Sequence, residues 1–131
     1  MSAFSNYSEA AYVDHFLRNN AVGSPTSVFL ALFESNPNED ASGTETSYVG
    51  YARQQAQWTA LDANGQTRNT AAISFAANGN ASASVTITHA AVFDSATAGN
   101  MLLHGPLASP KTLAVGDVLA FGINAMVLTL D

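Results

Sequence analysis

The side chains best suited to acid-base chemistry are the three histidines, which lie far apart along the chain: His15, His89 and His104. A catalytic histidine needs a nucleophile and an orienting carboxylate close to it, and the spacing of this sequence provides no evidence of either. His89 alternates with Ile87 and Phe93 in an extended segment, so we expect a core imidazole with one hydrogen-bond partner. The chain also lacks the G-x-S-x-G, P-loop and H-E-x-x-H patterns. We therefore predict that the protein is not an enzyme.

Carboxylates gather in segment 34–46, which holds four of the ten acidic residues: Glu34, Glu39, Asp40 and Glu45. Clustered carboxylates can bind calcium, but these do not follow the spacing of an EF-hand loop. Pro37 and Gly43 in the same segment favour an irregular surface loop. A solvated loop is the preferred interpretation, and a bound cation or a contact with a basic partner surface are the alternatives. We predict no metal and no cofactor.

Three aromatic residues and an arginine fall within one short stretch: Tyr48, Tyr51, Arg53 and Trp58. Rings can stack on the apolar faces of sugars while an arginine supplies hydrogen-bond donors, so this set could form a glycan-binding platform. Aromatic residues also favour strands and pack between them. We expect these side chains to lie in the core or at a subunit interface. Together with Tyr12 and Phe16 of a predicted helix, they are the candidate interface residues.

The composition is poor in charge, because charged residues make up 11% of the chain against about 25% of an average soluble domain. Small neutral and amide side chains then cover the surface, which can pack against another protein with little desolvation. This indicates permanent assembly. A solitary domain kept soluble by hydroxyls and amides is the alternative. The net charge of −6 and the four basic residues argue against nucleic acid as a partner.

The chain of 131 residues is expected to form one domain, 1–131, which buries roughly two-thirds of its unfolded surface. It has no cysteine, so it can form neither a disulfide nor a cysteine-based zinc site. The N-terminus has no basic segment followed by an apolar one, and no apolar stretch approaches the ~20 residues of a membrane span. We expect synthesis without Sec export and no membrane partner.

One helix is predicted, over residues 6–19, from apolar residues at helical spacing: Tyr12, Val13, Phe16 and Leu17. Asn6 is the expected N-cap, with Glu9 three residues later. The apolar stripe of this helix is expected to pack in the core of the same chain rather than to form an exposed docking surface.

Strands are predicted from apolar or alternating runs separated by turn residues, over 26–33, 47–62, 70–76, 81–93, 101–104 and 118–130. Segment 26–33 is apolar on both faces, so we expect its outer face to lie under the helix or a neighbouring subunit. Residues 118–130 are also apolar on both faces, which suggests an assembly element. In 81–93, one face of the strand is expected to carry Val85, Ile87, His89, Ala91 and Phe93. The predicted fold is mainly β, an antiparallel, jelly-roll-like β-sandwich of about seven strands with one N-terminal α-helix.

Several strings in this order resemble a family of small tailed-bacteriophage virion proteins that usually carry the label tail fibre protein. They are VFLALF at 28–33, YVGYARQ at 48–54, NTAAISF at 69–75, THAAVFD at 88–94, AGNMLLHG at 98–105 and SPKT at 109–112. Ala90 stands where many relatives have glycine, and Leu103 where they often have an aromatic residue. The resemblance spans nearly the whole chain and implies a structural part of the virion.

The resemblance leaves two places on the particle open, because similar small β domains serve as head decoration or cement proteins. We expect a multicopy capsid decoration protein that stabilises the head lattice and has the major capsid protein or another virion protein as its partner. The resemblance implies that such a protein packs as a small homo-oligomer, commonly a trimer. A fibre tip usually belongs to a longer chain with a shaft or attachment segment, which is not recognised here. A tail fibre or tail-associated host-adhesion protein is the alternative. Either would be assembled in the bacterial cytoplasm.

Overall fold

Within residues 3–130, which the computed structural model describes, the chain forms nine strands, one short α-helix and one π-helical segment. In chain order they are β1 (Ala3–Phe4), α1 (Asn6–Tyr12), η1 (Val13–Leu17), β2 (Val28–Phe33), β3 (Gln54–Ala56), β4 (Gln66–Arg68), β5 (Ile73–Ser74), β6 (Val85–Phe93), β7 (Met101–Leu113), β8 (Ala120–Phe121) and β9 (Val127–Thr129). The mainly β class with one N-terminal helix is thus confirmed, although there are more strands than the expected seven or so.

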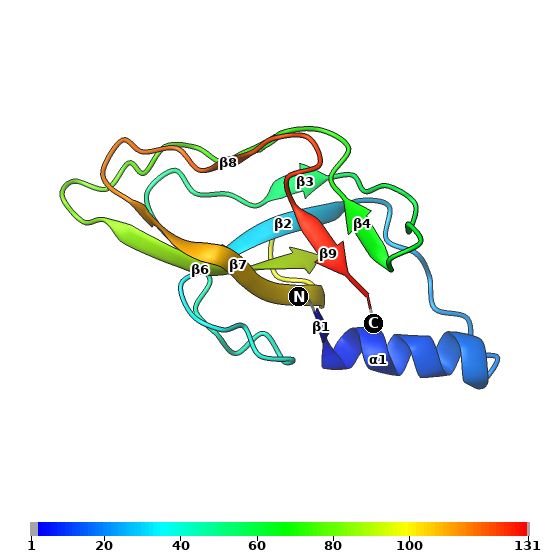
Figure 1. Cartoon of the computed structure of the whole chain (residues 1–131). Helices are drawn as coiled ribbons and strands as arrows, with labels where there is room; N and C mark the ends of the chain where they lie inside the picture. The colour runs from blue at the N-terminus through cyan, green and yellow to red at the C-terminus, as the bar shows by residue number, and fades with distance from the viewer. Residues whose placement is uncertain (1–2, 131) are drawn as a thin grey trace.

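The strands form three antiparallel sheets. A five-stranded sheet has the order β1-β7-β6-β2-β3, and two short ribbons pair β4 with β9 and β5 with β8. The ribbons lie over one face of the larger sheet (Figure 1). The fold is therefore sandwich-like, with a second layer that is built from short ribbons and loops.

The main core lies between these two layers. The larger sheet contributes Leu30, Leu32, Ile87, Ala90 and Val92, and the ribbon side contributes Ile73, Phe75, Leu119, Met126 and Leu128. Burial of a side chain of this size stabilises a fold by about 1.5 to 3 kcal/mol. The alternating apolar residues of the predicted strand at 70–76 pack here, which explains why only two of its residues need regular pairing.

A second apolar cluster lies on the opposite face of β2 and β6 and consists of Ala31, Phe33, Ala91, Phe93 and Met101. The strand at 28–33 is thus covered on both faces, as predicted from its unbroken apolar run. The cover differs from the expected one, because Ala41 of loop 34–46 packs on this cluster instead of the helix or a neighbouring subunit. The loop returns to the sheet through a bridge between Glu45 and Phe33.

The alternation predicted for 81–93 changes phase within β6. Val85 and Ile87 pack on the main core, whereas Ala91 and Phe93 belong to the second cluster. The change coincides with a register shift between Ile87 and His89 in the pairing with β7. A bulge adds residues to one strand and so reverses which face the following side chains occupy. The expectation of one continuous apolar face is therefore wrong.

Two predicted strand boundaries near the C-terminus are also wrong. β7 continues from Met101 to Leu113 through Pro106 and Pro110, which a strand tolerates where it is irregular or lies at a sheet edge. The predicted strand 118–130 is broken into β8 and β9 by a turn in which Asn124 has a φ of 64°. Its two apolar faces are not both covered within the chain, because Val118 is 54% exposed and Ile123 is 64% exposed.

The predicted helix 6–19 is confirmed in place but differs in its start and its packing. Its N-cap is Ser5 instead of Asn6, because the Ser5 hydroxyl accepts a hydrogen bond from the Ser8 N–H at 3.1 Å. The same hydroxyl donates to the Met101 carbonyl, which ties the helix to β7. Neither α1 nor η1 contains a buried residue. The expectation of an apolar stripe inside the core is wrong, because the helix lies beside the end of the sheet (Figure 1).

Candidate functional surfaces

An exposed apolar ridge runs along the helix and is formed by Tyr12, Val13, Phe16 and Leu17. Phe16 is 68% exposed and Leu17 71% exposed. The rings of Tyr12 and Phe16 lie 4.9 Å apart between centroids and are tilted by 35°, and His15 meets Phe16 edge-on at 4.8 Å. These ring contacts hold the ridge residues to one another. They leave much of their apolar surface in water, where contiguous apolar patches mark interaction sites.

A groove of about 680 Å³ lies beside this ridge, between the helix and the returning segment 22–26. Tyr7, Tyr12 and Phe16 line it from the helix, and Val22 and Pro25 line it from the returning chain. The Val22 N–H donates a hydrogen bond to His15 Nδ1 at 3.3 Å, which links its two walls. Tyr12 and Phe16, two of the candidate interface residues, are thus on the surface and lie together.

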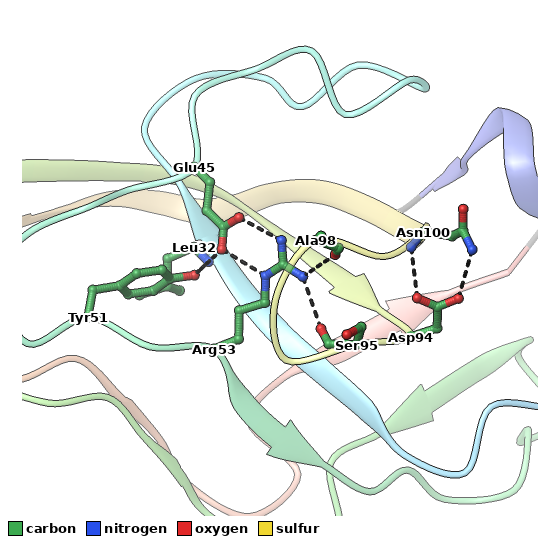
Figure 2. Close-up of polar contacts among 8 residues, drawn as sticks. All are labelled: Leu32, Glu45, Tyr51, Arg53, Asp94, Ser95, Ala98 and Asn100. Carbon is green, nitrogen blue, oxygen red and sulfur yellow. Dashed lines mark hydrogen bonds and ion pairs between the residues drawn. The ribbon is translucent and has the colours of Figure 1, made fainter.

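Arg53, a third candidate residue, is instead the centre of an internal network, and its side chain is only 8% exposed. Its guanidinium forms a two-pronged ion pair with Glu45, with N–O distances of 2.8 and 2.9 Å. It also donates to the carbonyls of Ser95 and Ala98 and lies 3.7 Å from the centre of the Phe93 ring. Figure 2 shows how these bonds tie three loops together.

Tyr51 completes this network, which gives it a structural role. Its hydroxyl donates to Glu45 Oε2 at 2.7 Å and accepts from the Leu32 N–H at 3.1 Å. Burial raises the pKa of the Glu45 carboxyl, but the hydrogen bonds from Arg53 and Tyr51 outweigh this and hold its pKa below the usual value. Burial and the neighbouring Glu45 raise the pKa of Tyr51 far above its ordinary value. The network thus holds Glu45 charged and Tyr51 neutral.

The remaining aromatic candidates do not form a common platform with Tyr51. Tyr48 is 4% exposed and donates its hydroxyl proton to the Ala76 carbonyl at 2.7 Å. Tyr48 packs edge-on against Tyr51, which in turn stacks on Phe75. Trp58 lies apart, half-buried against the main core and at the wall of a separate groove. The two tyrosines therefore pack in the core, as the preferred interpretation expected.

The histidines do not converge on a nucleophile. His15 lies on the exposed helix, while His89 and His104 lie on the paired strands β6 and β7. His89 is half-buried and shares one hydrogen bond with the Thr88 hydroxyl at 2.8 Å, close to the core imidazole that was expected. Burial and the nearby His104 lower the pKa of His89.

The acidic loop does not gather its carboxylates. Glu45 points inward to Arg53, while Asp40 accepts a hydrogen bond from the Ser42 N–H within the loop. Within residues 3–130, no three side chains of histidine, cysteine, aspartate or glutamate lie where they could hold one metal ion together. Most of the loop is exposed, as predicted, but Glu45 departs from that prediction.

Two buried asparagines, Asn69 and Asn78, were not predicted from the sequence to be functional or structural. Asn69 and Asn78 are 0% and 1% exposed. The Asn78 amide donates to the carbonyls of Ala83 and Leu113, and its oxygen accepts from the Asn80 N–H. A single asparagine in a polar string has no periodic pattern, so the sequence contains no signal that distinguishes these positions from exposed ones.

Comparison with known families assigns the chain to a class of phage proteins. The sequence profile described as podophage GP4 fiber I protein gp80 matches residues 3–129. The chain belongs to this family. The resemblance noted from the sequence strings is thereby confirmed, and the protein is a structural component of a tailed-phage virion. No curated protein matches the chain.

Among the described residues of this fibre-family chain, the helical ones are α1 and η1, near the N-terminus. Within residues 3–130, no helix combines the length and the apolar character that crossing a membrane requires.

Proposed function

We propose that this chain is a non-enzymatic structural subunit of a podophage fibre, and that its helix seats it against further copies of itself. The observation that supports the proposal is the exposed apolar ridge, in which Phe16 is 68% and Leu17 is 71% exposed. Covering the ridge removes this apolar surface from water, which stabilises the contact by roughly 25 cal/mol for each Å² buried. A ridge of this kind favours assembly over a free monomer.

The occupant we propose is a second copy of the chain, because each copy carries both an exposed apolar ridge and an adjacent groove, with Tyr12 and Phe16 belonging to both. The ridge projects at the end of the helix, and the adjacent groove between Tyr7, Phe16 and Pro25 is large and partly apolar. Insertion of one copy's ridge into the next copy's groove is a head-to-tail contact, which closes into a ring when the rotation allows. A trimer is the smallest such ring and is the assembly that we expect.

The test of this contact is the molar mass of the purified chain by light scattering. We expect the wild-type chain to be an oligomer and the double variant Phe16→Ser, Leu17→Ser to be a folded monomer. Ile123→Ser is the matched control, because Ile123 is 64% exposed but lies far along the chain in a turn. A monomeric wild-type chain, or a double variant that stays oligomeric, would contradict the proposal.

A capsid decoration protein is the second candidate, and the low charge of the chain favours it. With 11% charged residues, a broad surface can pack on a capsid lattice with little desolvation, and binding only the assembled lattice would stabilise it by mass action. Cryo-electron microscopy of the particle separates the candidates. Density for this chain on the tail supports the fibre proposal, whereas density only on the head supports decoration. Both candidates imply assembly in the host cytoplasm.

A further inference from the structure

A second groove, which we call the Trp58 groove, lies on the other side of the returning segment. It has a volume of about 480 Å³ and is lined by Pro25, Thr26, Gln55, Gln57, Trp58 and Thr70, among others. Its volume lies within the range of roughly 300 to 1,000 Å³ that is typical of small-ligand sites. The Trp58 groove shares only Pro25 and Thr26 with the groove beside the ridge.

The lining of the Trp58 groove combines one large ring with neutral polar groups. Trp58 packs on the main core and is half-buried, so the core fixes the ring while part of it borders the groove. The Gln55 amide donates to the Ser27 hydroxyl at 3.2 Å, which holds it at the rim. The Gln57 side chain is exposed and has no hydrogen-bond partner among the described residues, so its donors and acceptor face solvent.

The charge of the lining restricts the class of ligand. None of the residues that line the Trp58 groove is charged, so an ionised ligand would lose water without gaining an ion pair. A wholly apolar ligand would cover the free amide of Gln57 without satisfying it. An extended peptide cannot add here as a strand through Gln57, because the Gln57 carbonyl already accepts the Thr70 N–H at 2.9 Å. A neutral ligand with both apolar C–H faces and many hydroxyls meets each restriction.

We infer that the Trp58 groove binds a neutral saccharide, with one sugar ring against Trp58 and its hydroxyls on Gln57 and Thr70. The indole N–H of Trp58 is buried without a partner among the described residues, so this ring also retains an unsatisfied donor. The inference goes beyond the proposed function and does not depend on it. It also differs from the platform first considered for this stretch, because Tyr48 is buried in the core and Tyr51 is half-buried against it.

The chain supplies its own reporter for this test, because Trp58 is its only tryptophan. We would screen the full chain on an array of neutral and acidic bacterial surface oligosaccharides, and then titrate each positive oligosaccharide while recording tryptophan fluorescence. We expect saturable binding of at least one neutral oligosaccharide with a shift of the emission maximum. Binding of acidic oligosaccharides alone, or of none, would overturn the inference.

Variants then locate the binding site. Gln57→Ala and Thr70→Val retain the reporter and are each expected to weaken binding about 2- to 10-fold, because each removes one hydrogen-bonding group. Trp58→Leu, followed by calorimetry, is expected to weaken binding about tenfold through the lost ring contact. Gln54→Ala is the control, because Gln54 lies in β3, just before Gln57 in the chain, but does not line the groove. Unchanged affinity in both Gln57→Ala and Thr70→Val would exclude this groove.

Failure of this test and failure of the proposed assembly are distinguishable. The ridge variant Phe16→Ser, Leu17→Ser changes no residue of the Trp58 groove, so it reports on assembly alone. Gln57→Ala is likewise outside the ridge and its groove. Saccharide binding by a monomeric chain would support the inference and contradict the assembly proposal, and an oligomer without saccharide binding would do the reverse.

Discussion

At the scale of single residues, Asn69 shows how one amide can replace regular strand pairing. Its side chain donates to the carbonyls of Ala71 and Gly122, at 2.8 and 2.9 Å, and accepts from the Met126 N–H at 2.9 Å. Gly122 follows β8 and Met126 precedes β9, and these strands are only two and three residues long. The side chain therefore supplies hydrogen bonds that such short strands cannot make for themselves.

We expect Asn69→Ala to destabilise the protein by about 1 to 3 kcal/mol, because it leaves the buried Met126 N–H without its partner and removes the hydrogen bonds to the carbonyls of Ala71 and Gly122. Urea denaturation followed by circular dichroism measures the change. Asn20→Ala is the control, since Asn20 is exposed and its side chain makes no hydrogen bond among the described contacts. Equal stability of the two variants would show that the Asn69 amide is not a structural tie.

At the scale of elements, loop 34–46 is a packed cover and not only a solvated connection. Ala41 packs on the second apolar cluster, and Pro37 is almost fully buried. The loop folds back on itself so closely that a side chain at Gly43 would place its Cβ 2.2 Å from the Asn36 carbonyl oxygen. A glycine is needed there for space, since the obstructing atoms belong to the backbone.

Gly43→Ala is therefore expected to destabilise the protein by about 1 to 3 kcal/mol through overpacking. Gly23→Ala is the matched control, because a Cβ at Gly23 would meet nothing within 4 Å. Thermal denaturation of both variants beside the wild type gives the comparison. A Gly43→Ala variant as stable as Gly23→Ala would mean that the loop can relax without losing its packing.

At the scale of the whole molecule, the chain has a net charge of −6, and much of its response to acid should come from one internal ion pair. Glu45 has a pKa below its unfolded value because the bonds from Arg53 and Tyr51 outweigh its burial. A lowered pKa in the folded state contributes stability that is present above the unfolded pKa and is lost as the pH falls through the folded pKa. Stability should therefore decline in acid, below the ordinary range of a glutamate.

The variant Glu45→Gln tests whether the ion pair between Glu45 and Arg53 makes stability depend on pH. At pH 7 we expect a loss of about 2 kcal/mol, because the buried guanidinium of Arg53 loses its charged partner. The difference from the wild type should shrink as the pH falls towards 3, since acid removes the same charge from the wild type. Urea denaturation across this range checks it, with Glu39→Gln in the exposed part of the loop as control. A difference that does not change with pH would contradict the assigned role.

Features of the fold that depend on neighbouring residues could be predicted from the amino-acid pattern. The two-sided apolar run predicted the central strand β2, Pro37 and Gly43 predicted the loop at 34–46, and helical spacing predicted the N-terminal helix. The order of motifs was sufficient to indicate the phage family. These signals are local, because periodicity and turn chemistry reflect constraints within a few residues of each other.

Which apolar faces are covered depends on contacts between distant parts of the folded chain. The apolar stripe of the helix has the spacing of a core-facing helix. It stays exposed, because no other layer of the described chain covers it. Arg53 was expected in the core or at an interface, but its partners could not be predicted, because Glu45 and the carbonyls of Ser95 and Ala98 come from loops that meet it only in the folded chain. Likewise, β6 changes face where its pairing with β7 shifts register. Contacts between residues tens of positions apart set these outcomes, and no local pattern encodes them.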